Sequence, residues 1–198
     1  VYGPGEAVGA PDHPHRGFET VTYMLDGEFE HEDSAGHRGT LRPGDVQWMT
    51  AGAGIVHSEM PAAWLRAKGG RVHGFQIWVN LPARLKMTQP RYQELQGAAI
   101  PRARTPDGLA EVVVIAGAAL GIEAAIATHT PITYQDWTLK AGADVSVALP
   151  GDQTVLLHVF GGSLQVGETG TVVADGTCAV LGDGGVVRLR GGDEGGRA

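Results

Sequence analysis

The sequence contains only one cysteine, Cys178, among its 198 residues. A single thiol excludes an internal disulfide framework and a zinc site built from cysteines. Scarce cysteine is typical of a reducing compartment, so we expect a cytoplasmic location. Cys178 itself stands in an apolar run, where we interpret it as a buried small residue. No apolar run approaches the roughly 18 residues that a transmembrane helix needs, and we therefore expect no membrane span.

Lysine is absent from residues 1–60, and this part of the chain is strongly acidic. It carries 3 Arg against 10 Asp and Glu, whereas residues 61–198 carry 12 basic and 12 acidic residues, so the net charge of −7 lies in the first sixty residues. Such a surface repels phosphate backbones, so we expect no direct binding of nucleic acid. It tolerates a bound cation, and it offers a contact for a basic protein partner.

Glycine, by contrast, is abundant at 31 residues. The glycines separate short runs rich in aromatic and β-branched residues, as turns do in a β-rich protein. Asp26-Gly27 is a strong hairpin signal between two such runs. The patterns predict an all-β protein with few short helices. Strands are predicted at residues 18–25, 28–32, 46–49, 73–81, 111–116, 133–139, 144–149, 154–160, 164–166 and 186–189.

The second half of the chain echoes the first. Residues 156–166 resemble residues 21–31, and residues 170–181 resemble residues 39–50. Two related β-barrels in tandem explain this echo most simply. Residues 82–110 show no sustained period and contain several prolines, so we interpret them as a segment that wraps over the surface. We expect domains at 1–95 and 111–198, joined by a connector at 96–110.

Two short histidine motifs stand in the first half. In an extended chain, residues i and i+2 point to the same side, so His13 and His15 form one pair of neighbouring ligands, and His57 and Glu59 form another. Two such pairs on facing strands would bring three imidazoles and one carboxylate to one point. This donor set suits Fe, Ni, Mn, Zn or Cu. Glu19 follows His15 by four residues, so in an extended chain without a bulge it points to the same side as the first pair. It is therefore an alternative carboxylate ligand.

The spacing of these residues resembles the cupin motifs. The first motif corresponds to His13-x-His15-x3-Glu19-x7-Gly27, and the core of the second to Gly54-x2-His57. Three longer stretches, 13–23, 43–61 and 73–82, together with Pro90-Arg-Tyr-Gln, are very similar to the pirin family. The close match covers roughly residues 9–95. The chain begins with Val1 rather than methionine, and we expect that segments found in pirins before the first motif and after the second barrel are missing.

The resemblance to pirins implies two stacked cupin-type (jelly-roll) barrels, with one metal in the N-terminal barrel only. It maps the metal ligands onto His13, His15, His57 and Glu59, and it makes Glu19 a supporting residue near the barrel mouth. We expect one divalent transition metal, Fe(II) before Ni, Mn, Cu or Zn. The second half of the chain supports a single metal site, because the residues at the positions that correspond to the candidate ligands are not good metal ligands. These residues are Ala148, Pro150, Thr154, Leu189 and Gly191.

The resemblance also implies an activity like that of quercetin 2,3-dioxygenase. A flavonol would coordinate the metal through its hydroxyl and ketone oxygens, Glu59 would accept the hydroxyl proton as a general base, and carbon monoxide and a depside would form. One alternative is a metal- or redox-dependent interaction protein that acts as a transcriptional co-regulator. A weaker alternative is another cupin enzyme, such as an isomerase. Of the remaining histidines, we expect His31, in a run of glutamates, and His37, in a turn, to be solvated.

Overall fold

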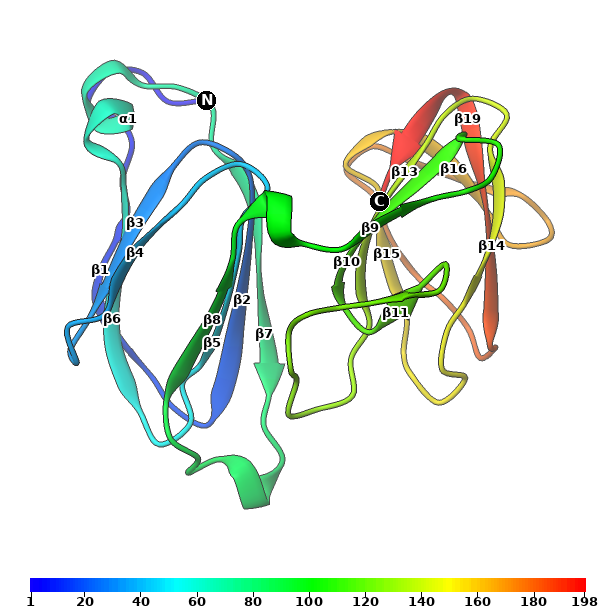
Figure 1. Cartoon of the computed structure of the whole chain (residues 1–198). Coiled ribbons are helices and arrows are strands. Elements are labelled where there is room, and N and C mark those ends of the chain that lie inside the picture. The colour runs from blue at the N-terminus through cyan, green and yellow to red at the C-terminus, as the bar shows by residue number, and fades with distance from the viewer. The chain divides into compact units, whose positions relative to one another are not determined.

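The computed structural model describes all residues from 1 to 198, and nearly all of its regular structure is β (Figure 1). There is one α-helix, α1 (Ala63–Lys68), and there are two 3-10 turns, η1 (Ala83–Leu85) and η2 (Gly97–Ala99). No helix is long and apolar enough to cross a membrane. The chain forms two compact units, one of residues 1–99 with 128–130 and one of residues 100–127 with 131–198.

Two four-stranded antiparallel sheets build the first unit, coloured blue to green in Figure 1. One sheet has the order β1-β6-β3-β4, with β1 (Ala10–His15), β6 (Ile55–Pro61), β3 (Phe29–Asp33) and β4 (Arg38–Leu41). The other has the order β7-β2-β5-β8, with β7 (His73–Asn80), β2 (Phe18–Asp26), β5 (Val46–Thr50) and β8 (Arg91–Leu95). Most connections therefore pass from one sheet to the other, as in a jelly roll, whereas β3 and β4 stay in one sheet and β7 and β8 in the other.

Glycine turns set the places where the chain passes from one sheet to the other. Gly27 adopts φ +90° between β2 and β3, and Gly44 adopts φ +93° between β4 and β5. Asp45 closes the second turn, because its carboxylate accepts a hydrogen bond from the Arg42 backbone N–H at 2.8 Å. A side chain with a Cβ rarely adopts a positive φ, so glycine at these positions favours the tight turns.

The second unit is built around one larger sheet of the order β17-β16-β19-β13-β10-β9, in which β14 also pairs with β19. Two small sheets, β11-β12 and β15-β18, complete it. Its core is an apolar cluster that includes Val112, Trp137, Leu157, Leu164 and Leu189. The strands are β9 (Arg102–Arg104), β10 (Ala110–Ala116), β11 (Ala118–Ala119), β12 (Ile122–Glu123), β13 (Tyr134–Leu139), β14 (Asp144–Ala148), β15 (Leu156–His158), β16 (Gly161–Val166), β17 (Thr171–Ala174), β18 (Cys178–Val180) and β19 (Val186–Arg197).

The predicted all-β class is confirmed, but two local predictions are wrong. Residues 82–110 are not only a surface segment, because they contain β8, which pairs with β5 along five residues, and β9, which pairs with β10. β8 is an edge strand, and its mixture of charged and polar residues hides the alternation. Cys178 is exposed rather than buried, because β18 pairs only with the short β15 in a two-stranded sheet.

Candidate metal centre

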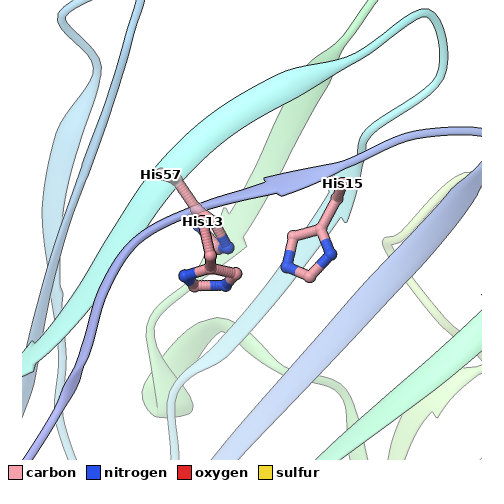
Figure 2. A group of neighbouring side chains, drawn as sticks. All are labelled: His13, His15 and His57. Atoms are coloured by element: carbon pink, nitrogen blue, oxygen red, sulfur yellow. The ribbon is translucent and has the colours of Figure 1, made fainter.

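The two histidine motifs lie on neighbouring strands of one sheet. β1 pairs with β6 so that His13 stands opposite His57, and an irregularity in register between Ala10 and His13 separates this pairing from that of Ala10 with Glu59. The motifs therefore sit side by side, and not on facing strands as the sequence had led us to expect. Figure 2 shows the three imidazoles of His13, His15 and His57 gathered in one space.

These three imidazoles are close enough to share one ion. Each offers one nitrogen, and the three nitrogens lie within 4.8 Å of one another. The ring centroids of His13 and His57 are 4.5 Å apart, and that of His15 lies 4.7 Å from His13 and 5.0 Å from His57. The rings are edge-to-face or tilted rather than stacked flat on one another.

Burial and hydrogen bonding prepare these rings to bind a cation. Nε2 of His15 and both ring nitrogens of His57 are buried without a hydrogen-bond partner. Burial, with the neighbouring histidines, lowers the pKa of His15, and burial lowers the pKa of His57 to about 4. His13 Nδ1 lies 2.8 Å from the Pro11 carbonyl oxygen, which can hold the tautomer that leaves Nε2 free. Neutral imidazoles with unsatisfied nitrogens fit a transition metal.

Glu59 lies two residues beyond His57 in the same strand and so faces the same side of the sheet. Its carboxylate accepts hydrogen bonds from Nε2 of Gln76 in β7, at 2.9 Å to Oε1 and 3.0 Å to Oε2. Gln76 Nε2 also lies 3.3 Å from the Thr22 hydroxyl in β2. The contact joins the two sheets and fixes the orientation of Glu59. Glu59 also acts on His15, since its charge raises the pKa of that ring against the effect of burial.

Glu19 lies on the opposite face of β2 from the residues near the histidines. β2 runs in unbroken register with β7 from Phe18 to Met24, so Phe18 and Thr22 share one face and Glu19 takes the other. Glu19 is fully buried there, and Oε1 accepts a hydrogen bond of 2.6 Å from the Thr50 hydroxyl. The sequence predicted that Glu19 points to the same side as His13 and His15. This alternation is interrupted at Gly17, which adopts φ +80° between β1 and β2.

Two aromatic residues border His15. Phe18 meets the His15 ring edge-on at a centroid distance of 5.1 Å, and Trp78 does so at 5.5 Å. The rings of Phe18 and Trp78 are themselves 4.7 Å apart. Trp78 is 63% exposed, so the pair forms an accessible aromatic wall beside the histidines. Sequence patterns could place both residues in strands, but not next to His15.

A cavity of about 220 Å³ lies next to Glu59. Most of its wall is apolar, and its polar side chains come from both sheets of the first unit. The lining residues are Val8, Gly9, Ala10, Thr22, Met24, Phe29, Glu30, His31, Leu41, Glu59, Val72, Gly74, Phe75 and Gln76. Glu59 lines this cavity, whereas none of the three clustered histidines does.

His31 is part of this wall, and the expectation that it is solvated is wrong. It is only 5% exposed, and it stands opposite Glu59 in the pairing of β3 with β6. Its Nε2 lies 2.7 Å from Oε1 of Glu94, and the hydrogen bond from His31 lowers the pKa of that carboxyl despite its burial. Alternation in β3 could have indicated this, because Phe29, His31 and Asp33 share the inner face. His37, as expected, is exposed, with its ring 2.9 Å from Asp33.

The fold and the clustered histidines define the chain as a protein with cupin-type barrels, and comparison with known proteins narrows this class. The model of the Pirin family matches residues 2–79. A crystal structure of quercetin 2,3-dioxygenase from Acinetobacter baumannii superimposes with a TM-score of 0.90 and 36% identity, over 99% of this chain and 68% of that one. The chain therefore belongs to the pirin family.

Curated relatives agree with this assignment. A pirin-like protein of Solanum lycopersicum is 48% identical over 180 residues, which cover 90% of this chain and 60% of the relative. A candidate quercetin 2,3-dioxygenase of Pseudomonas aeruginosa is 46% identical over 189 residues, which cover 92% of this chain and 65% of the relative. The chain thus spans about half to two thirds of the length of the curated relatives that it matches.

Proposed function

We propose that the first unit binds one divalent transition metal through His13, His15, His57 and Glu59, and that the protein is a flavonol 2,3-dioxygenase that acts on quercetin or a similar compound. The observation that carries the proposal is the convergence of three nitrogens within 4.8 Å, two of the rings being buried. The names of the relatives supply the reaction class, since two of them are a quercetin 2,3-dioxygenase and a candidate for one.

The set of ligand atoms is compatible with several transition metals and does not identify one of them. Three imidazoles and one carboxylate suit Fe(II), and also Ni, Mn, Cu and Zn. A metal bound there would act as a Lewis acid on the oxygens of a chelating substrate. Glu19 is not a competing ligand in this proposal, because it lies on the other face of β2 and its carboxylate is engaged by Thr50.

The side chains around the histidines have separate tasks in the proposed reaction. Glu59 accepts the proton of the flavonol 3-hydroxyl, which requires hydrogen-bond contact between the carboxylate and that hydroxyl. Gln76 holds both oxygens of Glu59 and so limits its rotation. Phe18 and Trp78 offer aromatic surface to the substrate rings and exclude water beside His15. Positioning by these groups contributes to the rate.

Oxygen consumption with quercetin tests the proposal. Protein loaded separately with Fe(II), Ni(II), Mn(II), Cu(II) and Zn(II) should, with at least one metal, consume one O₂ per quercetin and release carbon monoxide and a depside. Glu59→Gln should lower the rate strongly while the protein stays folded. Oxygen uptake at background with every metal would reject the dioxygenase, even if the metal binds.

The charge distribution favours a second candidate, a metal-dependent interaction protein. The excess of seven negative charges lies in residues 1–60, within the first unit, and would attract a basic partner. Part of this charge is already paired, for example between Glu32 and Arg38 and between Asp26 and Arg71. The test is binding of a basic partner by His13→Ala protein, and unchanged binding after loss of the metal would reject a metal-controlled interaction.

A further inference from the structure

We propose that Asp33 is a charge-balancing residue of the metal centre. Its buried carboxylate lies beside His57, does not bind the metal itself, and strengthens the binding of a divalent cation through its negative charge. The inference rests on the metal centre of the proposed function and is independent of whether the protein is a dioxygenase. It adds to the centre a residue from a third strand, β3, which has no part in the two histidine motifs.

Asp33 faces the same side of its sheet as two of the clustered histidines. His13 stands opposite His57 in the register of β1 with β6, and His57 stands opposite Asp33 in the register of β6 with β3. Residues directly opposite each other in an antiparallel pair point to the same face, with Cβ atoms about 4.5–5.5 Å apart. The three residues therefore form one row across neighbouring strands, and a cation held by the histidines lies within range of the Asp33 charge.

The turn after β3 keeps the Asp33 carboxylate ionised and fixed in place. The side chain is fully buried, and Oδ1 accepts hydrogen bonds from the backbone N–H groups of Ala35 at 2.8 Å and of His37 at 2.9 Å. Nδ1 of the His37 ring lies 2.9 Å from Oδ2. Burial opposes the charge, but these hydrogen bonds lower the pKa of Asp33 below its usual value. Because the turn engages both oxygens, Asp33 is a source of charge and not a further ligand.

A divalent ion at the cluster gains from a carboxylate in this place. Three neutral imidazoles and the carboxylate of Glu59 leave such an ion with one uncompensated positive charge. An uncompensated charge in a partly buried site is costly, and its attraction to a carboxylate is stronger there than in water. Asp33 supplies the missing negative charge from the strand next to His57, and it leaves free any coordination position that a substrate needs.

Asp33→Asn removes this charge and keeps the shape of the turn, because Oδ1 of the amide can still accept both backbone hydrogen bonds. The affinity for Zn(II), measured by competition with a chromophoric chelator, should fall about tenfold, the lower end of the loss of about 10–100-fold that is typical for groups next to metal ligands. Asp45→Asn is the matched control, because Asp45 is also buried and accepts hydrogen bonds from two backbone N–H groups, those of Arg42 and Gly97. Equal affinities of the two variants overturn the proposal.

Two comparisons separate the charge of Asp33 from its support of the turn. His37→Gln changes an exposed residue of the same turn and leaves the Asp33 charge, so the affinity for Zn(II) should be unchanged. For Cu(I), measured without oxygen, Asp33→Asn should lose only about threefold, because the Coulomb energy of a single charge is half that of a double charge. Equal losses for Zn(II) and Cu(I), or a loss in His37→Gln as large as that in Asp33→Asn, mean that the substitution acts through the structure of the turn and contradict a role of the charge.

A measurement on the unaltered protein covers the case in which Asp33→Asn does not fold. In protein with ¹³C-labelled aspartate, Zn(II) should move the carboxyl resonance of Asp33 within the range of an ionised carboxylate and leave that of Asp45 in place. No movement of the Asp33 resonance at saturation rejects the inference. Absence of oxygen uptake with quercetin rejects the dioxygenase and leaves these results intact, whereas unaltered protein that binds no Zn(II) rejects the metal centre and this inference together.

Discussion

Gln76→Leu is the substitution that most directly asks whether Glu59 is held as a metal ligand. Leucine has a similar size but no polar group, so the carboxylate of Glu59 loses its contacts of 2.9 and 3.0 Å with Nε2. The protein should stay folded, because Gln76 is exposed and belongs to a β7 that keeps its backbone pairing with β2. The affected quantity should be the affinity for the metal.

The structure sets the size of this effect. Both contacts come from one nitrogen, so they count as a single hydrogen bond to a charged acceptor, worth about 1.5–3 kcal/mol when buried. Gln76 is exposed, which favours the lower end of this range. Removing a group that orients a metal ligand typically lowers affinity by about 10–100-fold. We therefore expect about tenfold weaker metal binding, equal to about 1.4 kcal/mol.

Competition with a chromophoric chelator measures this affinity. Gln135→Leu is the matched control, because Gln135 has the same relation to a tryptophan two residues later as Gln76 has to Trp78. Trp137 Nε1 donates to Gln135 Oε1 at 2.8 Å, and Trp78 Nε1 lies 3.4 Å from Gln76 Oε1. Gln135 belongs to the second unit, far along the chain from the histidines. Equal affinities of the two variants would refute the role given to Gln76 and Glu59.

Three further predictions concern buried groups of the first unit. In protein stripped of metal by a chelator, His57 should titrate near pH 4 by NMR. Because the unfolded chain takes up this proton near pH 6.5, the free energy of unfolding should fall by about 3 kcal/mol between pH 6.5 and 4, and chemical denaturation should show it. Thr50→Val should destabilise the protein by about 1–3 kcal/mol, because buried Glu19 loses its hydrogen bond, while metal content stays unchanged. Gly39→Ala should lower the melting temperature, because the added Cβ would overlap Nε2 of His31.

The sequence was sufficient to predict the all-β class and the two local pairs of candidate ligands, because both depend on short-range patterns, and the resemblance to pirins supplied the expectation that the two pairs meet. Two-residue alternation brings His13 and His15, and separately His57 and Glu59, to one side of a strand. It could not predict that β1 and β6 are hydrogen-bonded neighbours, since strand pairing is a long-range property. It also left open whether Glu19 is a metal ligand. Glu19 lies on the other face of its strand because the alternation of side chains is interrupted at Gly17, which adopts a positive φ.

The surroundings of the cluster were beyond prediction for a related reason. Gln76 reaches Glu59 from the other sheet, and Glu94 reaches His31 from an edge strand that the prolines and charges of residues 82–110 had hidden. These contacts join residues 17 and 63 positions apart, and no local pattern records them. The charged neighbours of His31 in β3 pointed to solvent, although the inner face of that strand is buried.

Elemental analysis of the protein purified without added metal tests the metal site most directly. We predict one equivalent of a single transition metal per chain, and loss of that metal in His15→Ala but not in the second-unit control His158→Ala. Both variants should give the same far-ultraviolet circular dichroism as the unaltered protein. Metal that remains at full occupancy in His15→Ala, or protein that takes up no metal even when it is offered, would contradict a centre at these three histidines.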